Sequence, residues 1–165
     1  MQRRPPRRTA GDLPGLDLAE QKSWQSYLDA AIRFDAAMNR RLTDQHRLPV
    51  VDLRVLDALS KSADGEAQMG DLAAMVDSRR DRLSKRIHRL EERGLVSRRT
   101  RPEDRRKIMA VITEAGLELV RLATDTYAEG VRHDFLGSLS RAQVSAIEEN
   151  CRRINDGLMA SEPSP

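Results

Sequence analysis

The 165-residue chain has few cysteines and aromatic residues: one cysteine, one tryptophan, two tyrosines and two phenylalanines. The single cysteine, Cys151, cannot form a disulfide within the chain, which argues against a disulfide-stabilised secreted scaffold. None of the three histidines, His46, His88 and His133, has a second ligand at the spacing of a metal site. We therefore expect no metal centre, and we expect Cys151 to be a buried packing residue.

The chain also lacks long apolar runs and catalytic motifs. No stretch approaches the roughly 20 apolar residues that cross a bilayer, and the arginine-rich start contains no hydrophobic signal segment. No phosphate-binding loop, nucleophile elbow or paired-carboxylate motif is present. These absences argue against a membrane protein and against an enzyme, so we expect a cytoplasmic protein that uses no cofactor.

Charged residues make up 33% of the chain, and the positive charge lies mainly in one segment. Residues 78–107 hold 13 Lys and Arg against 5 Asp and Glu, whereas residues 1–77 (11 against 12) and 114–165 (5 against 9) are slightly acidic. Such a segment attracts phosphates by releasing counterions, and arginine adds forked donors that suit phosphate oxygens and guanine edges. A basic run alone is typical of a solvated surface, so its structural setting decides between the two interpretations.

The first half of this segment has the pattern of an amphipathic helix. Leu83, Ile87 and Leu90 fall on one narrow stripe at about 100° per residue, which predicts the buried face. Ser78 is placed to cap the start of the helix, and Gly94 is typical of its end. A basic flank lies beside the stripe: Arg79, Arg80, Arg82, Lys85, Arg86, Arg89 and Arg93.

The second half predicts a β-hairpin. Residues 95–100 and 108–113 are rich in apolar or β-branched side chains, and they bracket a charged, turn-rich loop at 101–107. Two shorter helices, at about 50–59 and 69–76, precede the basic helix. The order helix, turn, helix, hairpin is that of a winged helix-turn-helix, in which a basic helix leads into a hairpin with a basic tip.

The segments LEERGLV (90–96) and ITEAG (112–116), with Asp104-x-Arg106 between them, resemble the core of MarR-type transcriptional regulators. The motifs cover about residues 52–116, with Ile112 where the family usually has leucine. The resemblance implies that the helix at 78–93 enters the DNA major groove and that Arg106 reaches the minor groove, while Asp104 holds the wing in shape. It also implies a homodimer on a pseudo-palindromic operator, and a small aromatic or anionic effector.

Both ends of the chain predict long helices with apolar stripes. One runs over about 17–47, another starts near 114 and ends before Leu136, and a third follows a capping box of Ser140 and Gln143. A second copy of the chain would cover these stripes and place two recognition helices about one DNA turn apart. An intramolecular bundle of the three helices is the alternative. The stripe residues include Trp24, Leu28, Met38, Leu42, Val144, Ile147, Cys151, Ile154 and Leu158.

We therefore expect a mainly α fold with a small β-hairpin wing, in three parts. Residues 1–16 form a disordered basic tail, residues 49–113 the winged helix-turn-helix domain, and residues 17–48 with 114–160 a helical dimerisation region built from both chain ends. Arg79 and Arg80 are candidates for reading bases, whereas Lys85, Arg86 and Arg89 are placed for phosphates. Asp81 could accept from a cytosine amino group, but an acidic residue in a first turn more often stabilises the helix dipole. The expected DNA-contacting set is Ser78, Arg79, Arg80, Arg82, Lys85, Arg86, Arg89, Arg105, Arg106 and Lys107, with Asp104 stabilising the wing.

These features predict a sequence-specific DNA-binding regulator, and by family analogy a repressor that an effector releases from its operator. Trp24, Tyr27, Arg33 and Arg54 are candidates for the effector pocket from their positions on the first two helices. The competing hypothesis is a helical adaptor that acts through protein contacts and binds DNA only non-specifically. So much like charge on one surface argues for DNA binding, because like charges repel when no polyanion is bound.

Overall fold

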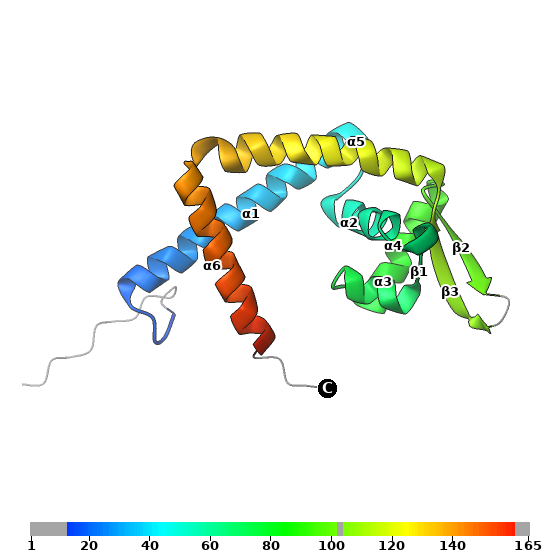
Figure 1. Ribbon diagram of the computed structural model, residues 1–165, viewed down its shortest axis with the longest axis horizontal. Coiled ribbons are helices and arrows are strands. Elements are labelled where there is room, and N and C mark those ends of the chain that lie inside the picture. The colour runs from blue at the N-terminus through cyan, green and yellow to red at the C-terminus, as the bar shows by residue number, and fades with distance from the viewer. Residues whose placement is uncertain (1–12, 102–103, 161–165) are drawn as a thin grey trace, which may run out of the picture. The chain divides into compact units, whose positions relative to one another are not determined.

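The computed structural model describes residues 13–101 and 104–160, without the side chains of 101–106 (Figure 1). It has two compact units, residues 1–37 and 38–165, which are considered separately. The mainly α fold with a small sheet confirms the expected class. The elements are α1 (Leu18–His46), α2 (Val50–Ser60), a 3-10 turn (Ala63–Gly65), β1 (Glu66–Gln68), α3 (Met69–Met75), α4 (Arg80–Glu92), β2 (Val96–Arg101), β3 (Asp104–Ile112), α5 (Glu114–Gly130), a π turn (Val131–Phe135), a 3-10 turn (Leu136–Ser138) and α6 (Arg141–Ala160).

The first unit contains the start of α1, where Asp17 acts as the cap. The Asp17 carboxylate accepts from the backbone N–H groups of Ala19 and Glu20, at 2.7 and 2.9 Å, and the Glu20 carboxylate accepts from the Asp17 N–H at 2.7 Å. This reciprocal pattern satisfies donors that the first turn of a helix leaves open. The predicted tail at 1–16 lies outside the described residues except for its last four positions.

The second unit contains the winged helix-turn-helix, built around one apolar core. Leu56 of α2, Leu72 of α3 and Leu83 of α4 are each fully buried, so the three helices share their apolar faces. Figure 1 shows the paired strands β2 and β3 extending away from these helices as a hairpin. The other fully buried core residues are Met38, Leu42, Leu48, Val55, Leu59, Ile87, Leu90, Val96, Ala110 and Ala123.

The sheet differs from the predicted hairpin in two respects. It has three antiparallel strands in the order β1-β3-β2, and sequence reasoning missed β1, whose Ala67 pairs with Ala110. The predicted start of the second strand at residue 108 was wrong, because β3 already begins at Asp104. Residues 104–107 look like a loop because they are charged, but in an antiparallel ladder the backbone makes the hydrogen bonds and charged side chains can project into solvent. The strands therefore extend almost to the tip.

The chain-end helices have the predicted bounds, and α5 buries Val120 and Ala123 within one chain. The capping box of α6 is confirmed: the Ser140 N–H donates to the Gln143 side chain at 2.8 Å, and the Gln143 N–H donates to the Ser140 hydroxyl at 3.3 Å. However, none of the residues of α6 is buried. The prediction that Cys151 is buried was therefore wrong for the single chain, where its side chain is exposed. Within the described part of the chain, every helix is too short or too polar to span a membrane.

Four backbone segments meet where α4 ends and α5 begins. Gly94 ends α4 with a φ of +71°, a conformation that glycine adopts without strain. The Thr113 hydroxyl donates to the Gly94 carbonyl oxygen at 2.7 Å and accepts from the Gly116 N–H at 3.1 Å, which caps α5. The Leu95 carbonyl lies so close that a Cβ on Gly116 would be 2.3 Å from its oxygen. The segment 112–116 is thus the joint that ties the recognition helix, the wing and α5 together.

Replacing Gly116 with alanine tests this joint. Because the new methyl group would collide with backbone, which cannot turn away as a side chain can, Gly116→Ala should lower the free energy of unfolding by about 1–3 kcal/mol. Chemical denaturation followed by circular dichroism measures the change.

Gly157→Ala in α6 is the matched control. A Cβ at Gly157 meets nothing within 4 Å, so alanine should leave stability unchanged or raise it by up to about 1 kcal/mol through its better helix propensity. A Gly116→Ala protein as stable as the wild type would mean that the close approach to Leu95 is not a constraint.

Candidate nucleic-acid interface

The recognition helix α4 has one apolar face and one basic face. Leu83, Ile87 and Leu90 are fully buried, as their spacing predicted. Arg82, Lys85 and Arg89 are exposed, and their side chains form no hydrogen bond or ion pair with the rest of the described chain. Ser84 and His88 are also exposed on α4, although the expected DNA-contacting set did not include them.

The start of α4 is organised differently from the prediction. Ser78 does not cap the helix: Arg79 is the N-cap residue, with φ −65° and ψ 141°, and no side chain accepts from the first turn. The Ser78 N–H instead donates to the Ala73 carbonyl at 2.9 Å, which closes the tight link from α3. Arg79 makes an exposed ion pair with Asp81 at 3.3 Å. The first turn therefore presents Arg79, Arg80 and Asp81 at the exposed end of the helix.

Arg86 is the exception on the basic flank. Its guanidinium donates to the carboxylate of Asp52 at 2.9 Å, and the two side chains are 27% and 7% exposed. Asp52 lies in the first turn of α2, which begins after Pro49. The structure therefore directs Arg86 inward toward α2, whereas the sequence pattern placed it among the phosphate-contacting residues.

The base of the wing is held by two further ion pairs. Arg98 of β2 binds Glu91 of α4 through its side chain, at 2.6 to 2.7 Å, and through its backbone N–H at 3.2 Å. The hydrogen bond from the Arg98 side chain is the main reason that the pKa of Glu91 is lowered. Arg99 pairs with Glu66 of β1. These contacts fix the orientation of the hairpin relative to α4.

Toward the tip of the wing, Lys107 is exposed. The side chains of Asp104, Arg105 and Arg106 lie outside the described residues, although the backbone of all three belongs to β3. A cleft of about 280 Å³ separates α4 from the hairpin, and its lining combines the start of α3 with basic side chains. The lining residues are Gln68, Met69, Gly70, Arg80, Ser84, Arg98, Lys107 and Ile108.

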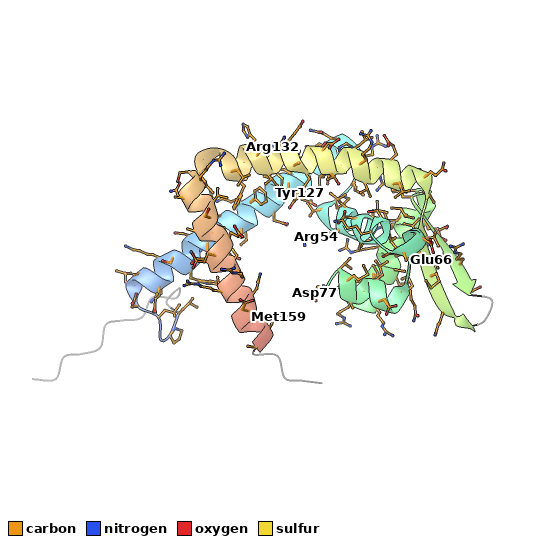
Figure 2. All side chains as sticks on the ribbon, viewed as in Figure 1. Arg54, Glu66, Asp77, Tyr127, Arg132 and Met159 are labelled. Atoms are coloured by element: carbon orange, nitrogen blue, oxygen red, sulfur yellow. The ribbon has the colours of Figure 1, made fainter. Side chains whose placement is uncertain are left out.

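A second cavity, of about 310 Å³, lies on the other side of α4, against α2 and the link between α3 and α4. Figure 2 labels two of its residues, Arg54 and Asp77, which come from α2 and from that link. Arg54 and Arg82 make no ion pair with the rest of the described chain, so the cavity offers unneutralised positive charge. Its lining is Val51, Arg54, Val55, Val76, Asp77, Ser78, Arg79, Arg82 and Arg86.

The four candidate effector residues lie on two elements, three on α1 and one on α2. Trp24, Tyr27 and Arg33 are exposed on α1, where the two rings contact each other with centroids 6.0 Å apart. Arg54 lines the cavity just described and a smaller, more apolar one between α2 and α5. That cavity has a volume of about 280 Å³ and is lined by Val50, Leu53, Arg54, Asp57, Lys61, Thr124 and Tyr127. Sequence reasoning missed Tyr127 because its spacing on α5 is that of a packing residue.

The chemistry of this surface is that of polyanion binding. An exposed basic helix face and a basic hairpin are set at a fixed angle by ion pairs at the hairpin base, and donors with this arrangement suit a nucleic-acid backbone. Among the described residues, no group of three His, Cys, Asp or Glu side chains is arranged to hold a metal ion.

Comparison with known proteins agrees with this arrangement. A MarR family model matches residues 47–107. The HTH-type transcriptional repressor IacR of Pseudomonas putida is 30% identical over 107 residues, which span 65% of this chain and only 62% of that relative.

Two solved structures from Streptomyces coelicolor match over nearly the whole chain. Sco3205, a MarR family transcriptional regulator crystallised in complex with DNA, is 31% identical with a TM-score of 0.81, over 91% of this chain and 94% of that chain. AbsC, a MarR family transcriptional regulator, is 28% identical with a TM-score of 0.80, over 90% and 100%. With this fold, this identity and the motifs of its wing, the chain belongs to the MarR family of transcriptional regulators.

Proposed function

We propose that this protein is a homodimeric repressor that binds a pseudo-palindromic DNA operator in sequence-specific fashion. The observation that carries the proposal is the basic face of α4. Arg82, Lys85 and Arg89 are exposed there and have no ion-pair partner among the described residues. The hairpin beside them is held to the same helix by Arg98 and Glu91. Cations without a partner can replace the counterions of DNA phosphates. Because their support is rigid, little conformational entropy is lost when DNA binds. The DNA in the crystals of Sco3205 and the name of the relative IacR support the assignment.

In this proposal each part of the surface has its own role. α4 enters the major groove, where Arg79 and Arg80 in its first turn reach base edges. Lys85 and Arg89 contact phosphates and position the helix, with Arg82 beside them. Arg106 reaches the minor groove from the wing, flanked by Arg105 and Lys107, while Asp104 keeps the wing in shape; these wing roles rest on the family resemblance.

We assign residues 49–113 to DNA binding and residues 17–48 with 114–160 to dimerisation. The support is the apolar surface that one chain leaves uncovered. Ile154 and Leu158 of α6 are 57% and 63% exposed, and Trp24 and Ile32 of α1 are 47% and 58% exposed. A helix gains most of its stability by burying its apolar face, so these stripes call for a partner, and a second copy is the simplest one.

The effector in this proposal is a small anion, aromatic or not, that binds beside α2. Arg54 is the residue that supports this choice, since its side chain is exposed and lines both the basic cavity against α4 and the apolar cavity against Tyr127. An acid with an apolar ring matches a cation next to an apolar wall. A ligand in either cavity contacts α2 and an element packed against it. The ligand can therefore have different affinities for the DNA-bound and the DNA-free protein, which is what release from DNA requires.

The DNA-binding assignment is tested with duplexes selected by the wild-type protein from a random-sequence pool. We expect a selected motif with two half-sites about 10 base pairs apart. Arg106→Ala should then weaken binding to the selected duplex at least tenfold at fixed salt, corresponding to about 1.4 kcal/mol or more. Gel shifts with competitor DNA measure both results.

Arg141→Ala, an exposed arginine at the start of α6, is the control and should bind as the wild type does. Selection that yields no motif, with binding that competitor removes completely, would favour the adaptor hypothesis. An unchanged affinity of Arg106→Ala would remove the wing arginine from the contact set.

Dimerisation is tested by sedimentation equilibrium at micromolar concentration. The wild type should have twice the mass of one chain, whereas Ile154→Asp should have the mass of one chain, because the substitution places a charge in an apolar contact. Ser145→Asp lies on the opposite side of α6 and should remain dimeric. A wild-type protein with the mass of one chain would instead support the intramolecular bundle.

The effector site is tested by releasing the selected duplex with benzoate, a hydroxybenzoate and urate. At least one of these acids should release wild-type protein, and Arg54→Gln should require tenfold or more of the same acid while binding DNA as before. Arg132→Gln, an exposed arginine outside both cavities, should respond as the wild type does (Figure 2). Equal responses of Arg54→Gln and wild type would refute the site.

A further inference from the structure

Asp52 is the one charged side chain that is buried in the described part of the chain. It lies in the first turn of α2, where its own N–H donates to the Pro49 carbonyl. Its carboxylate accepts from the guanidinium of Arg86 at 2.9 Å. A carboxylate removed from water in this way needs a partner, since an unpaired buried charge is strongly unfavourable.

Because the buried Asp52 carboxylate needs a counter-charge, the side chain of Arg86 is held beside α2. To reach a phosphate, Arg86 would have to leave the Asp52 carboxylate buried without a counter-charge. Lys85, the next residue on α4, is exposed and has no such partner in the described chain, so it can meet a phosphate at no comparable cost. The two neighbouring cations on α4 thus have opposite surroundings.

The pair also adds something that the apolar face of α4 does not supply. Leu83, Ile87 and Leu90 hold α4 against the core, but apolar contact is non-directional and tolerates small rotations of a helix about its axis. A charge-assisted hydrogen bond is directional, and Arg86 lies at the edge of the apolar stripe, where a rotation changes its distance to α2 the most. The pair therefore fixes which side chains of α4 face outward.

We propose that Asp52 is a positioning residue for DNA recognition: by holding Arg86 it sets the rotation of α4 and thereby the base-reading position of Arg79 and Arg80. This inference rests on the proposed function and assigns to Arg86 a role in specificity and not in phosphate contact. Asp52 touches no DNA in this arrangement and acts only through Arg86.

The experiment compares Arg86→Gln, Asp52→Asn and the double variant with Lys85→Gln as the matched control. For each protein, affinity is measured over a range of salt concentrations on the selected duplex and on a scrambled duplex of the same length, and the melting temperature is measured without DNA. Affinity falls as salt rises, and Lys85→Gln should make the slope of log affinity against log salt less steep by about one, as for a lost phosphate contact. The melting temperature should stay unchanged.

The single variants of the pair should behave differently from Lys85→Gln. Arg86→Gln and Asp52→Asn should keep the wild-type salt slope, melt at lower temperature, and lose at least tenfold in the ratio of selected to scrambled affinity. The double variant D52N/R86Q replaces the ion pair with two amides that can hydrogen-bond without a buried charge, so it should recover much of the ratio and of the melting temperature.

Three results would overturn the proposal: a salt slope reduced by about one in Arg86→Gln, a wild-type ratio in Asp52→Asn, or a lower melting temperature with an unchanged ratio in both single variants. The last would mean that the pair only stabilises the fold. If Arg86→Gln does not fold, Asp52→Asn and the double variant still decide. A wild-type protein that selects no motif would refute the proposed function, while salt slopes on the scrambled duplex would still decide whether Arg86 contacts phosphate.

Discussion

The winged domain depends on the close contact between Gly116 at the start of α5 and the backbone of Leu95 at the end of α4. There, one threonine hydroxyl bonds both to the Gly94 carbonyl and to the first turn of α5, and no side chain fits between the two segments. β2 follows directly after the first of these segments, and β3 leads directly into the second. The contact therefore fixes both ends of the hairpin at its base. The helix α4, the hairpin and the helix α5 therefore share one rigid joint.

Electrostatics divides the basic segment into two functional groups. Arg86, Arg98 and Arg99 are paired with carboxylates on other elements, and their charge is used to fix α4 and the hairpin in position. The exposed cations on α4 have no such partners in the described chain and stay available to an external anion. The same residue types therefore serve two purposes on this surface. Only the presence or absence of a carboxylate partner distinguishes an arginine that holds the fold from one that is free to bind an anion.

Sequence patterns predicted the parts of the molecule that depend on neighbours in the chain. The period of the apolar residues in α4 and the glycine at its end predicted that helix to within two residues. The strand β1 has only three residues and exists because Ala67 pairs with Ala110, far away in the sequence. The partner of Arg86 is equally remote, since no local pattern connects α2 with α4. Residue type was therefore enough to predict that Lys85 is exposed, but not that Arg86 turns inward to Asp52.

The bare surface of α6 has a consequence for how such a regulator responds to its own abundance. A helix that buries none of its residues within one chain makes its stability a function of protein concentration wherever a second copy covers it. At low concentration, operator occupancy would then rise more steeply than in proportion to the protein concentration, because two chains must associate before they can bind the operator. A modest change in synthesis or turnover of the protein would be converted into a sharper change in transcription.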